Sequence, residues 1–406
     1  MPVLLSQFIE ACRWVGALLV LAVHSTNMFV NLADIMSAPH AASVYAWWFF
    51  VSFELGHQAV VGFFAISGYL VGGAVLAQLR KGKPFLRDYL IHRFARIYIV
   101  LAPALLVTAA ADWIGRGWFG DSGVYDWPVF KDHDRADLFL GSLGNLAAIY
   151  CDFFGTNGPL WSLACEFWYY ISFPLLLLPF ARAYSPRTRA AGFALGLAIV
   201  VVMSIPSGGW FRFGYLLWGL GALATLAPRP LVKSRWLALA LYVAAVIPIR
   251  LLVRGPILVA LPFLADLADL LAAVLFLNLV ATLRFGPDEG WALFRPQLHR
   301  RLADFSFSLY SVHMPLLILA RAIVDQRFGA LWARELATQA HWMTMAAVMT
   351  AALLFGFLFS RVTEARTNAA RRAMRAGFET AENWRRRRFP PPVTEAIVPE
   401  PEKADA

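Results

Sequence analysis

Arg13 and His24 are the first residues in the chain whose types and spacing indicate chemistry. They stand eleven positions apart within one long apolar run. In an α-helix, eleven residues turn through about 1100°, roughly 20° more than three full turns, and rise about 16 Å. Both side chains therefore lie on one face of the helix. Because histidine titrates near neutral pH, His24 is a candidate general base if a water-accessible cavity reaches it.

Charged residues also lie at the start of, or inside, two later apolar runs. Arg93 and Arg96 stand at the start of an apolar run, and their i,i+3 spacing puts both guanidinium groups on one helix face, where they can clamp a phosphate. Glu166 lies about eight residues inside a later run, at a depth of roughly 12 Å. A lone carboxylate at that depth needs a partner. A charge within a membrane span costs about 2.5–3.5 kcal/mol or more, which makes each of these residues a functional candidate.

A histidine and a pair of aspartates add to these candidates. His313 stands two residues before Pro315 in a late apolar run, where the proline predicts a kink. Asp266 and Asp269 form an i,i+3 pair in or near another run, and the pattern leaves open whether they bind an acceptor or carry a proton. We expect no metal site, because the sequence contains neither a CxxC pair nor an HExxH motif.

Most of these candidates also have a structural interpretation. Arg13 could extend its charge to the membrane interface, and His24 could join two helices through a hydrogen bond. Glu166 could belong to an ion pair, and Arg93 and Arg96 could be ordinary positive flanks of a span. The sequence alone leaves these alternatives open.

The apolar composition predicts what positions these residues. Of the 406 residues, 59% are hydrophobic and only 15% are charged, against about 25% charged in soluble domains. About ten runs are long enough to cross ~30 Å of hydrocarbon as a helix. We therefore predict an all-α, polytopic transmembrane helix bundle with spans at 8–30, 59–79, 95–113, 158–180, 190–206, 211–227, 236–252, 256–281, 305–324 and 341–361. The segments 44–57 and 138–150 are too short to span and are expected to be interfacial or re-entrant.

The charges in the loops predict the orientation. Lys and Arg gather in loops at 80–96, 182–189, 229–235 and 284–301. The loop 112–152 carries seven Asp instead. Positive residues favour the cytoplasmic side, which places both termini there. Residues 1–361 then form the transmembrane domain, and the basic residues 362–406, which lack apolar periodicity, are expected to be a disordered cytoplasmic tail. The positive charge is dispersed through loops, which argues against a nucleic-acid partner.

Five short motifs follow one another in the order known from one family of membrane proteins. They are Arg13 with His24 after ten intervening residues, Phe63-Phe64-Ala65-Ile66-Ser67-Gly68-Tyr69, Arg93-Phe94-Ala95-Arg96, Leu160-Trp161-Ser162-Leu163 followed by Glu166, and the segment from Ser306 to Pro315 that contains His313. With them the chain resembles acyltransferase family 3, the integral membrane O-acyltransferases of surface polysaccharides and exopolysaccharides. The resemblance extends from about residue 8 to residue 361.

The resemblance implies an acyl-CoA-dependent O-acyltransferase of the inner (cytoplasmic) membrane. An acyl group, acetyl foremost, would pass from cytoplasmic acyl-CoA to a hydroxyl of a cell-surface carbohydrate or similar acceptor. His24 and Glu166 would be catalytic, and Arg13, Arg93 and Arg96 would bind the donor. Ser67, Tyr69, Trp161 and His313 would support the site. Acyl-CoA would be a substrate, and we expect no bound cofactor.

Two other functions stay open at the level of sequence. A secondary transporter would also carry His, Glu and Asp within spans that Pro and Gly interrupt. A non-catalytic subunit for polysaccharide export would need none of the proposed chemistry. Transporters of this kind often consist of two matching halves, whereas the sequence shows no internal repeat.

Overall fold

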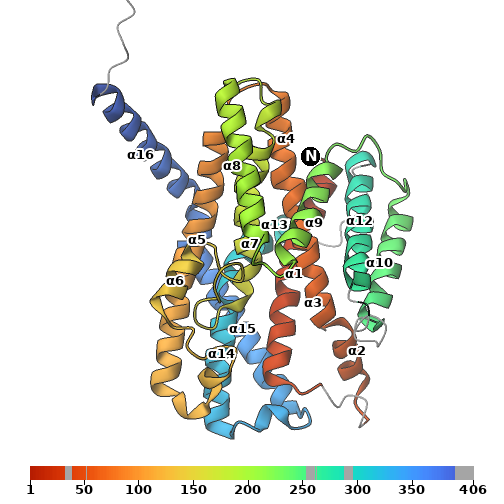
Figure 1. Ribbon diagram of the computed structural model, residues 1–406. Coiled ribbons are helices and arrows are strands. Elements are labelled where there is room, and N and C mark those ends of the chain that lie inside the picture. Colours follow the sequence, from red (N-terminus) through yellow and green to blue (C-terminus); the bar gives the residue numbers. More distant parts are fainter. Residues whose placement is uncertain (33–38, 52, 253–260, 262, 288–295, 389–406) are drawn as a thin grey trace, which may run out of the picture.

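The computed structural model shows a bundle of long helices (Figure 1). It describes residues 1–32, 39–51, 53–252, 261, 263–287 and 296–388. Within these ranges, 8 helical stretches are long and apolar enough to cross a membrane, and β-structure is limited to isolated bridges. The prediction of an all-α protein that passes through the membrane several times is therefore confirmed.

The 8 stretches coincide with eight of the ten predicted spans. Their helices are α1 (Val3–Phe29), α3 (Phe53–Ser67) continued by η1 (Gly68–Gly72) and α4 (Gly73–Arg80), α5 (Leu86–Trp118), α7 (Trp161–Leu176), α8 (Pro186–Ser204), α12 (Phe263–Phe285), α14 (Ser306–Phe328) and α15 (Gln339–Val362). The predicted spans 211–227 and 236–252 form α9 (Trp210–Ala224) and α10 (Arg235–Leu252). α9 has only 15 residues. In the predicted span 256–281, residues 256–260 and 262 lie outside the described part.

Short helices and turns complete the bundle. They are α2 (Ala42–Phe50), α6 (Ala136–Leu143), α13 (Pro296–Ala303), α16 (Thr367–Arg388), η2 (Gly120–Ser122), η3 (Val124–Asp126), η4 (Gly158–Leu160), η5 (Leu178–Phe180), η6 (Trp332–Arg334) and η7 (Glu364–Arg366). α2 and α6, with 9 and 8 residues, fall in the two segments predicted to be too short to span.

The segment predicted to be disordered differs from its prediction. Residues 367–388 form the 22-residue helix α16, which extends from the bundle at the end where the N-terminus lies (Figure 1). The stretch is rich in Ala and Arg, which favour helix, and its apolar positions are too few to give the periodicity of a buried helix. Residues 389–406 of the predicted tail lie outside the described residues.

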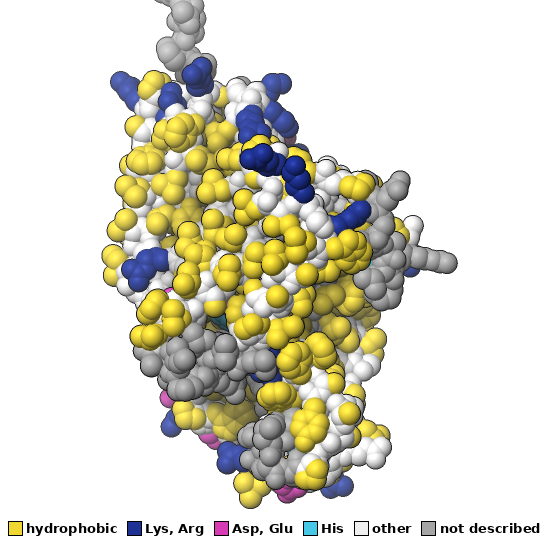
Figure 2. Space-filling view, turned by 90° about the vertical axis from the view of Figure 1, so that its right-hand side faces the viewer, with side chains coloured by type: hydrophobic (Ala, Val, Ile, Leu, Met, Phe, Trp, Pro, Cys, Tyr) yellow, Lys and Arg dark blue, Asp and Glu magenta, His cyan; other side chains and the backbone are white. Residues whose placement is uncertain are grey.

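The two ends of the bundle differ in charge. On the face drawn in Figure 2, most Lys and Arg gather at the upper end, whereas the lower end shows Asp and Glu together with a few Lys and Arg. Hydrophobic side chains cover most of the surface between them. We call the upper end, which holds the N-terminus and α16, the basic end, and the opposite end the acidic end. This separation is the pattern from which the orientation was predicted.

The second span contains a π-helical turn where it crosses α9. In η1, a Cβ added at Gly68 would lie 1.7 Å from the carbonyl oxygen of Trp218. One added at Gly221 would lie 2.1 Å from the carbonyl oxygen of Ala65. Only glycine allows two helix backbones to approach so closely, and π-turns of this kind often occur at functional sites. The crossing brings Ser67 to α9, where the Trp218 indole N–H donates to its Oγ at 3.0 Å.

Replacing Gly221 with alanine should destabilise the protein, because the added methyl group must push α9 away from α3. Overpacking of this kind costs about 1–3 kcal/mol or more. Gly219→Ala is the matched control on the same helix, since a Cβ there meets nothing within 4 Å. Thermal unfolding in detergent, followed by size-exclusion chromatography, should show a lower Tm for Gly221→Ala only. Equal Tm values for the two variants would contradict the close crossing.

Candidate active site

A cavity of about 430 Å³ lies between α1, α3, α5, α7 and α14. It brings together five residues that the sequence singled out, namely Arg13, Ser67, Arg93, Arg96 and Glu166. Aromatic side chains, among them Phe63, Phe64 and Phe307, make up much of the remaining wall. Charged and polar groups from four helices therefore converge on one mainly apolar chamber, as is usual for sites that bind organic substrates.

Glu166 is held by a chain of hydroxyl groups. The hydroxyl of Tyr170 donates to Glu166 Oε2 at 2.9 Å, and its oxygen lies 2.9 Å from Ser67 Oγ. The Tyr170 proton is already used, so Ser67 must donate to Tyr170. Ser67 in turn accepts from Trp218. Three hydrogen bonds thus run in one direction toward the carboxylate, and Tyr170, which the motifs did not include, is the partner that a carboxylate inside the bundle needs.

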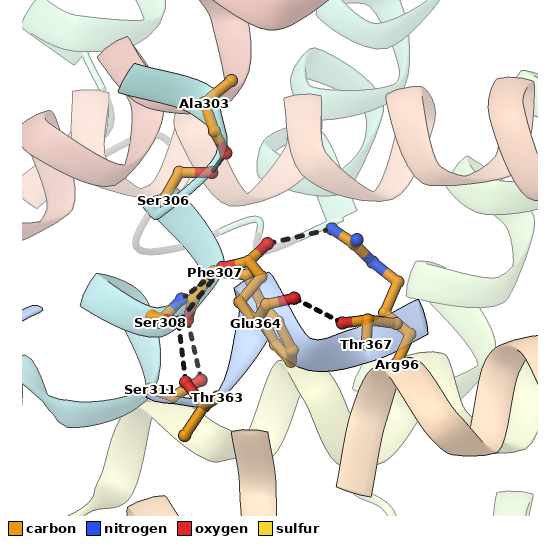
Figure 3. Close-up of polar contacts among 9 residues, drawn as sticks. All are labelled: Arg96, Ala303, Ser306, Phe307, Ser308, Ser311, Thr363, Glu364 and Thr367. Carbon is orange, nitrogen blue, oxygen red and sulfur yellow. Dashed lines mark hydrogen bonds and ion pairs between the residues drawn. The ribbon is translucent and has the colours of Figure 1, made fainter. Parts of the chain in front are cut away.

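Arg96 is fixed by a carboxylate outside the motifs. Its Nη2 lies 3.3 Å from Glu364 Oε1, and Glu364 Oε2 accepts from the backbone N–H of Ser308 at 3.2 Å and from its hydroxyl at 3.1 Å (Figure 3). The Glu364 side chain is 7% exposed and that of Arg96 is 38% exposed. The pair therefore joins α5, α14 and η7. One signal could have identified Glu364, since it is an acid that follows the last apolar run directly within a basic stretch.

His24 and His313 form a hydrogen-bonded pair. Nδ1 of His24 lies 2.8 Å from Nε2 of His313, and the two rings are nearly parallel, with an interplanar angle of 6° and centroids 5.1 Å apart. His313 is 1% exposed, and its Nδ1 lies 2.7 Å from the carbonyl oxygen of Tyr310. Two histidines from spans almost 290 residues apart in sequence therefore share one polar contact inside the bundle.

The Tyr310 carbonyl fixes which nitrogen of each neutral ring carries the proton. A carbonyl oxygen only accepts, so His313 Nδ1 must donate to it, which leaves Nε2 of the neutral ring as an acceptor. His24 Nδ1 must then donate to that Nε2. Consequently, Nε2 of neutral His24 keeps an unprotonated lone pair. The arrangement is the one that a general base requires, with a second group that orients its ring.

Tyr310 connects the histidine pair to the cavity. Its side chain lines the cavity, and its ring lies 5.7 Å from that of His313. The Tyr310 hydroxyl donates to the Pro159 carbonyl at 2.8 Å and therefore accepts from Ser162 Oγ, also at 2.8 Å. His24 and His313 are not among the lining residues of the cavity; His313 lies next to the Tyr310 wall, and His24 is bonded to His313.

Besides His313, two of the predicted supporting residues lie outside the cavity lining. Tyr69 is buried in an apolar cluster with Leu4 of α1 and Phe276 of α12. Trp161 packs against the lining residue Phe64, with ring centroids 6.1 Å apart. Trp161 is thus close to the site, whereas Tyr69 belongs to the packing between helices.

The two aspartates of α12 have different environments. Asp266 is exposed, while Asp269 is buried and bonded through both carboxylate oxygens, to His57 Nε2 at 2.6 Å and to Gln58 Nε2 at 2.5 Å. The His57 ring meets Trp210 edge-on at 5.3 Å. Among the residues described, no group of three or more His, Cys, Asp and Glu side chains could hold a metal ion.

A buried turn before α7 is a further feature that the sequence analysis missed. The backbone N–H and the hydroxyl of Thr156 both donate to Asp112, at 2.8 and 2.7 Å. The Asn157 amide donates to Thr108 and to the Ser311 carbonyl, at 3.0 and 2.9 Å. These bonds fix the start of α7 between α5 and α14, and with it the positions of Trp161 and Glu166. In the sequence, nothing distinguished Asp112 from the other aspartates of the loop 112–152.

Comparison with known proteins agrees with the motifs. Residues 6–361 match a family model described as "Acyltransferase domain". An uncharacterized protein of Haemophilus influenzae is 29% identical over 128 residues, which are 29% of this chain and 47% of that protein. The chain therefore spans about half the length of this curated relative. No solved structure matches the chain.

Removing the Glu364 carboxylate should destabilise the junction of α5, α14 and η7. Glu364→Ala leaves the Arg96 guanidinium and the Ser308 N–H without their acceptor, which should cost about 1–3 kcal/mol. Glu364→Gln keeps an acceptor for Ser308 and should cost less. Tm values of both variants and of the wild type would measure the difference. An unchanged Tm in Glu364→Ala would show that the junction does not depend on this carboxylate.

Proposed function

The chain belongs to the membrane acyltransferase family whose domain model covers residues 6–361, and on this premise we propose its reaction. An acyl group, acetyl foremost, passes from cytoplasmic acyl-CoA to a hydroxyl of a cell-surface carbohydrate or similar acceptor. One observation carries this proposal. The guanidinium groups of Arg13, Arg93 and Arg96 line the same cavity as Tyr310, and behind Tyr310 lies the pair of His313 and His24, in which His313 orients the His24 ring.

The donor enters from the basic end, which we assign to the cytoplasm. Arg13, Arg93 and Arg96 line the cavity and bind the phosphates of CoA, because guanidinium groups match phosphate oxygens in charge and geometry. The Arg93 guanidinium lies 5.9 Å from the ring centroids of both Tyr89 and Tyr170. These rings orient Arg93 without neutralising it, so its charge is available to a phosphate.

His24 removes the proton from the acceptor hydroxyl. As the proton moves to His24 Nε2, the acceptor oxygen bonds to the thioester carbonyl carbon. The C–S bond then breaks, the sulfur leaves with the electron pair, and the protonated imidazole returns the proton to that thiolate. His313 holds the ring of His24 in the required tautomer. Glu166, fixed by Tyr170, accepts a hydrogen bond from a bound substrate within the cavity.

The acceptor approaches from the acidic end. Trp210 is 39% exposed and lies 5.4 Å from Trp161, centroid to centroid. Trp161 in turn contacts the cavity wall at Phe64. An exposed indole offers a flat apolar face for a sugar ring. The two tryptophans, with His57 beside Trp210, therefore suit a carbohydrate acceptor whose hydroxyl points toward the cavity.

His24→Ala should lower kcat by about 10²–10⁴-fold, because a positioned general base contributes that much. His313→Ala should also lower kcat, since His24 then loses the group that fixes its tautomer. In both variants the Kd for CoA should stay near that of the wild type, because neither residue contacts the phosphates. Turnover of acetyl-CoA by the purified full chain and CoA binding would be measured side by side. Normal turnover in His24→Ala would exclude it as the base.

Deleting the gene should remove one acyl group per modified unit from a surface glycan. Mass spectrometry of cell-surface glycans would show a loss of about 42 mass units for acetyl or about 100 for succinyl, by elementary chemistry. Complementation with the wild-type gene should restore the mass, and complementation with the His24→Ala gene should not. A glycan profile that deletion leaves unchanged would contradict a carbohydrate acceptor.

A further inference from the structure

A fourth guanidinium group enters the cavity from outside the predicted transmembrane domain. Arg371, on α16, lines the cavity together with Arg13, Arg93 and Arg96. By sequence, Arg371 belongs to the stretch predicted to be a disordered tail, where no role is expected for it. Its position makes the helix after the last span part of the wall of the cavity.

Contacts at both ends hold this stretch of α16 against α5. Before Arg371, the Thr367 hydroxyl donates to the carbonyl of Glu364 at 2.6 Å, and Glu364 is bound to Arg96 of α5 (Figure 3). After it, Arg375 lies 3.2 Å from Asp88. Thr367, Arg371 and Arg375 are spaced i,i+4, so they share the face of α16 that meets α5.

The exposed contact is the weaker of the two. Asp88 and Arg375 are 69% and 44% exposed, and such surface pairs contribute less than about 1 kcal/mol. The buried carboxylate of Glu364 is therefore the firmer attachment. Because Arg371 follows Glu364 by only seven residues, this attachment also fixes Arg371.

The charges around Arg371 are mostly of its own sign. Its electrostatic neighbours are Arg93, Arg96 and Arg375. The Nε atoms of Arg371 and Arg93 are both buried and lack a hydrogen-bond partner. A buried donor without an acceptor costs about 1–3 kcal/mol, and the nearby carboxylate of Glu364 is already shared between Arg96 and Ser308. An anion between Arg371 and Arg93 would satisfy both donors and reduce the repulsion.

We propose that Arg371 and Arg93 form a phosphate-binding site in which α16 supplies one wall. The inference rests on the proposed function, because it identifies the ligand as a phosphate group of the organic diphosphate that carries the acyl thioester. Arg371 contacts the donor far from the thioester carbon. Its removal therefore weakens donor binding.

The test compares Arg371→Gln with Arg372→Gln in the full chain, purified into nanodiscs of neutral phosphatidylcholine. Arg372 is exposed and adjacent, so its variant is a control with the same change of charge. Titrations with CoA and with inorganic pyrophosphate measure Kd. We expect Arg371→Gln to raise both Kd values at least about tenfold, as loss of a charge-assisted hydrogen bond does. Arg372→Gln should keep both Kd values within about twofold of the wild type, and its turnover of acetyl-CoA should match that of the wild type.

Three results would distinguish this inference from the proposed function. If Arg371→Gln binds both probes like the wild type while Arg93→Gln loses CoA, the inference is overturned and the CoA donor stands. If the wild type binds pyrophosphate through Arg371 but does not bind CoA, the phosphate site stands and the proposed donor fails. Nanodiscs with phosphatidylglycerol form the third arm. If this lipid weakens pyrophosphate binding only when Arg371 is present, the site takes a lipid headgroup and its assignment to the donor is overturned.

Discussion

The Glu364 carboxylate is the interaction on which the basic half of the cavity depends. A charge within an apolar bundle must find partners inside the protein, and Glu364 finds them on α5 and α14 at once. By binding Arg96 it sets the geometry of a motif arginine, and by ending the last span it determines where α16 starts. Two cationic walls of the cavity thus derive their positions from one buried carboxylate.

The predicted base differs from the usual arrangement in which a carboxylate orients a histidine. Here a second histidine orients His24, and a backbone carbonyl orients that histidine. A carbonyl dipole fixes the tautomer without adding a full negative charge to an apolar interior. Any charge that His24 acquires during the reaction must then be offset by the substrate, and the departing thiolate is the anion that forms at the same time.

Spacing and hydropathy predicted much of the fold and part of the site. Spans could be predicted because a membrane requires long apolar runs, and Arg96 or Glu166 could be found because charges inside such runs are rare. Arg371 could not, since it lies in a basic stretch after the last run, where charges are ordinary, and the only signal for Glu364 was that it is an acid within that basic stretch. Tyr170 resembled one more aromatic residue of a span. It stands four residues after Glu166 on α7, which puts the two side chains on one helix face, whereas the Ser67 hydroxyl reaches Tyr170 only through the folded packing of α3 against α7.

The length of α9 has a consequence for the membrane itself. Its 15 residues rise about 22 Å, which is less than the ~30 Å thickness of bilayer hydrocarbon. A helix shorter than the bilayer draws the lipid headgroups inward beside it. Trp210 begins this helix, and its ring lies 5.4 Å from that of Trp161. Thinning of the bilayer beside α9 would therefore shorten the distance that a polar acceptor travels through hydrocarbon to reach the two tryptophans.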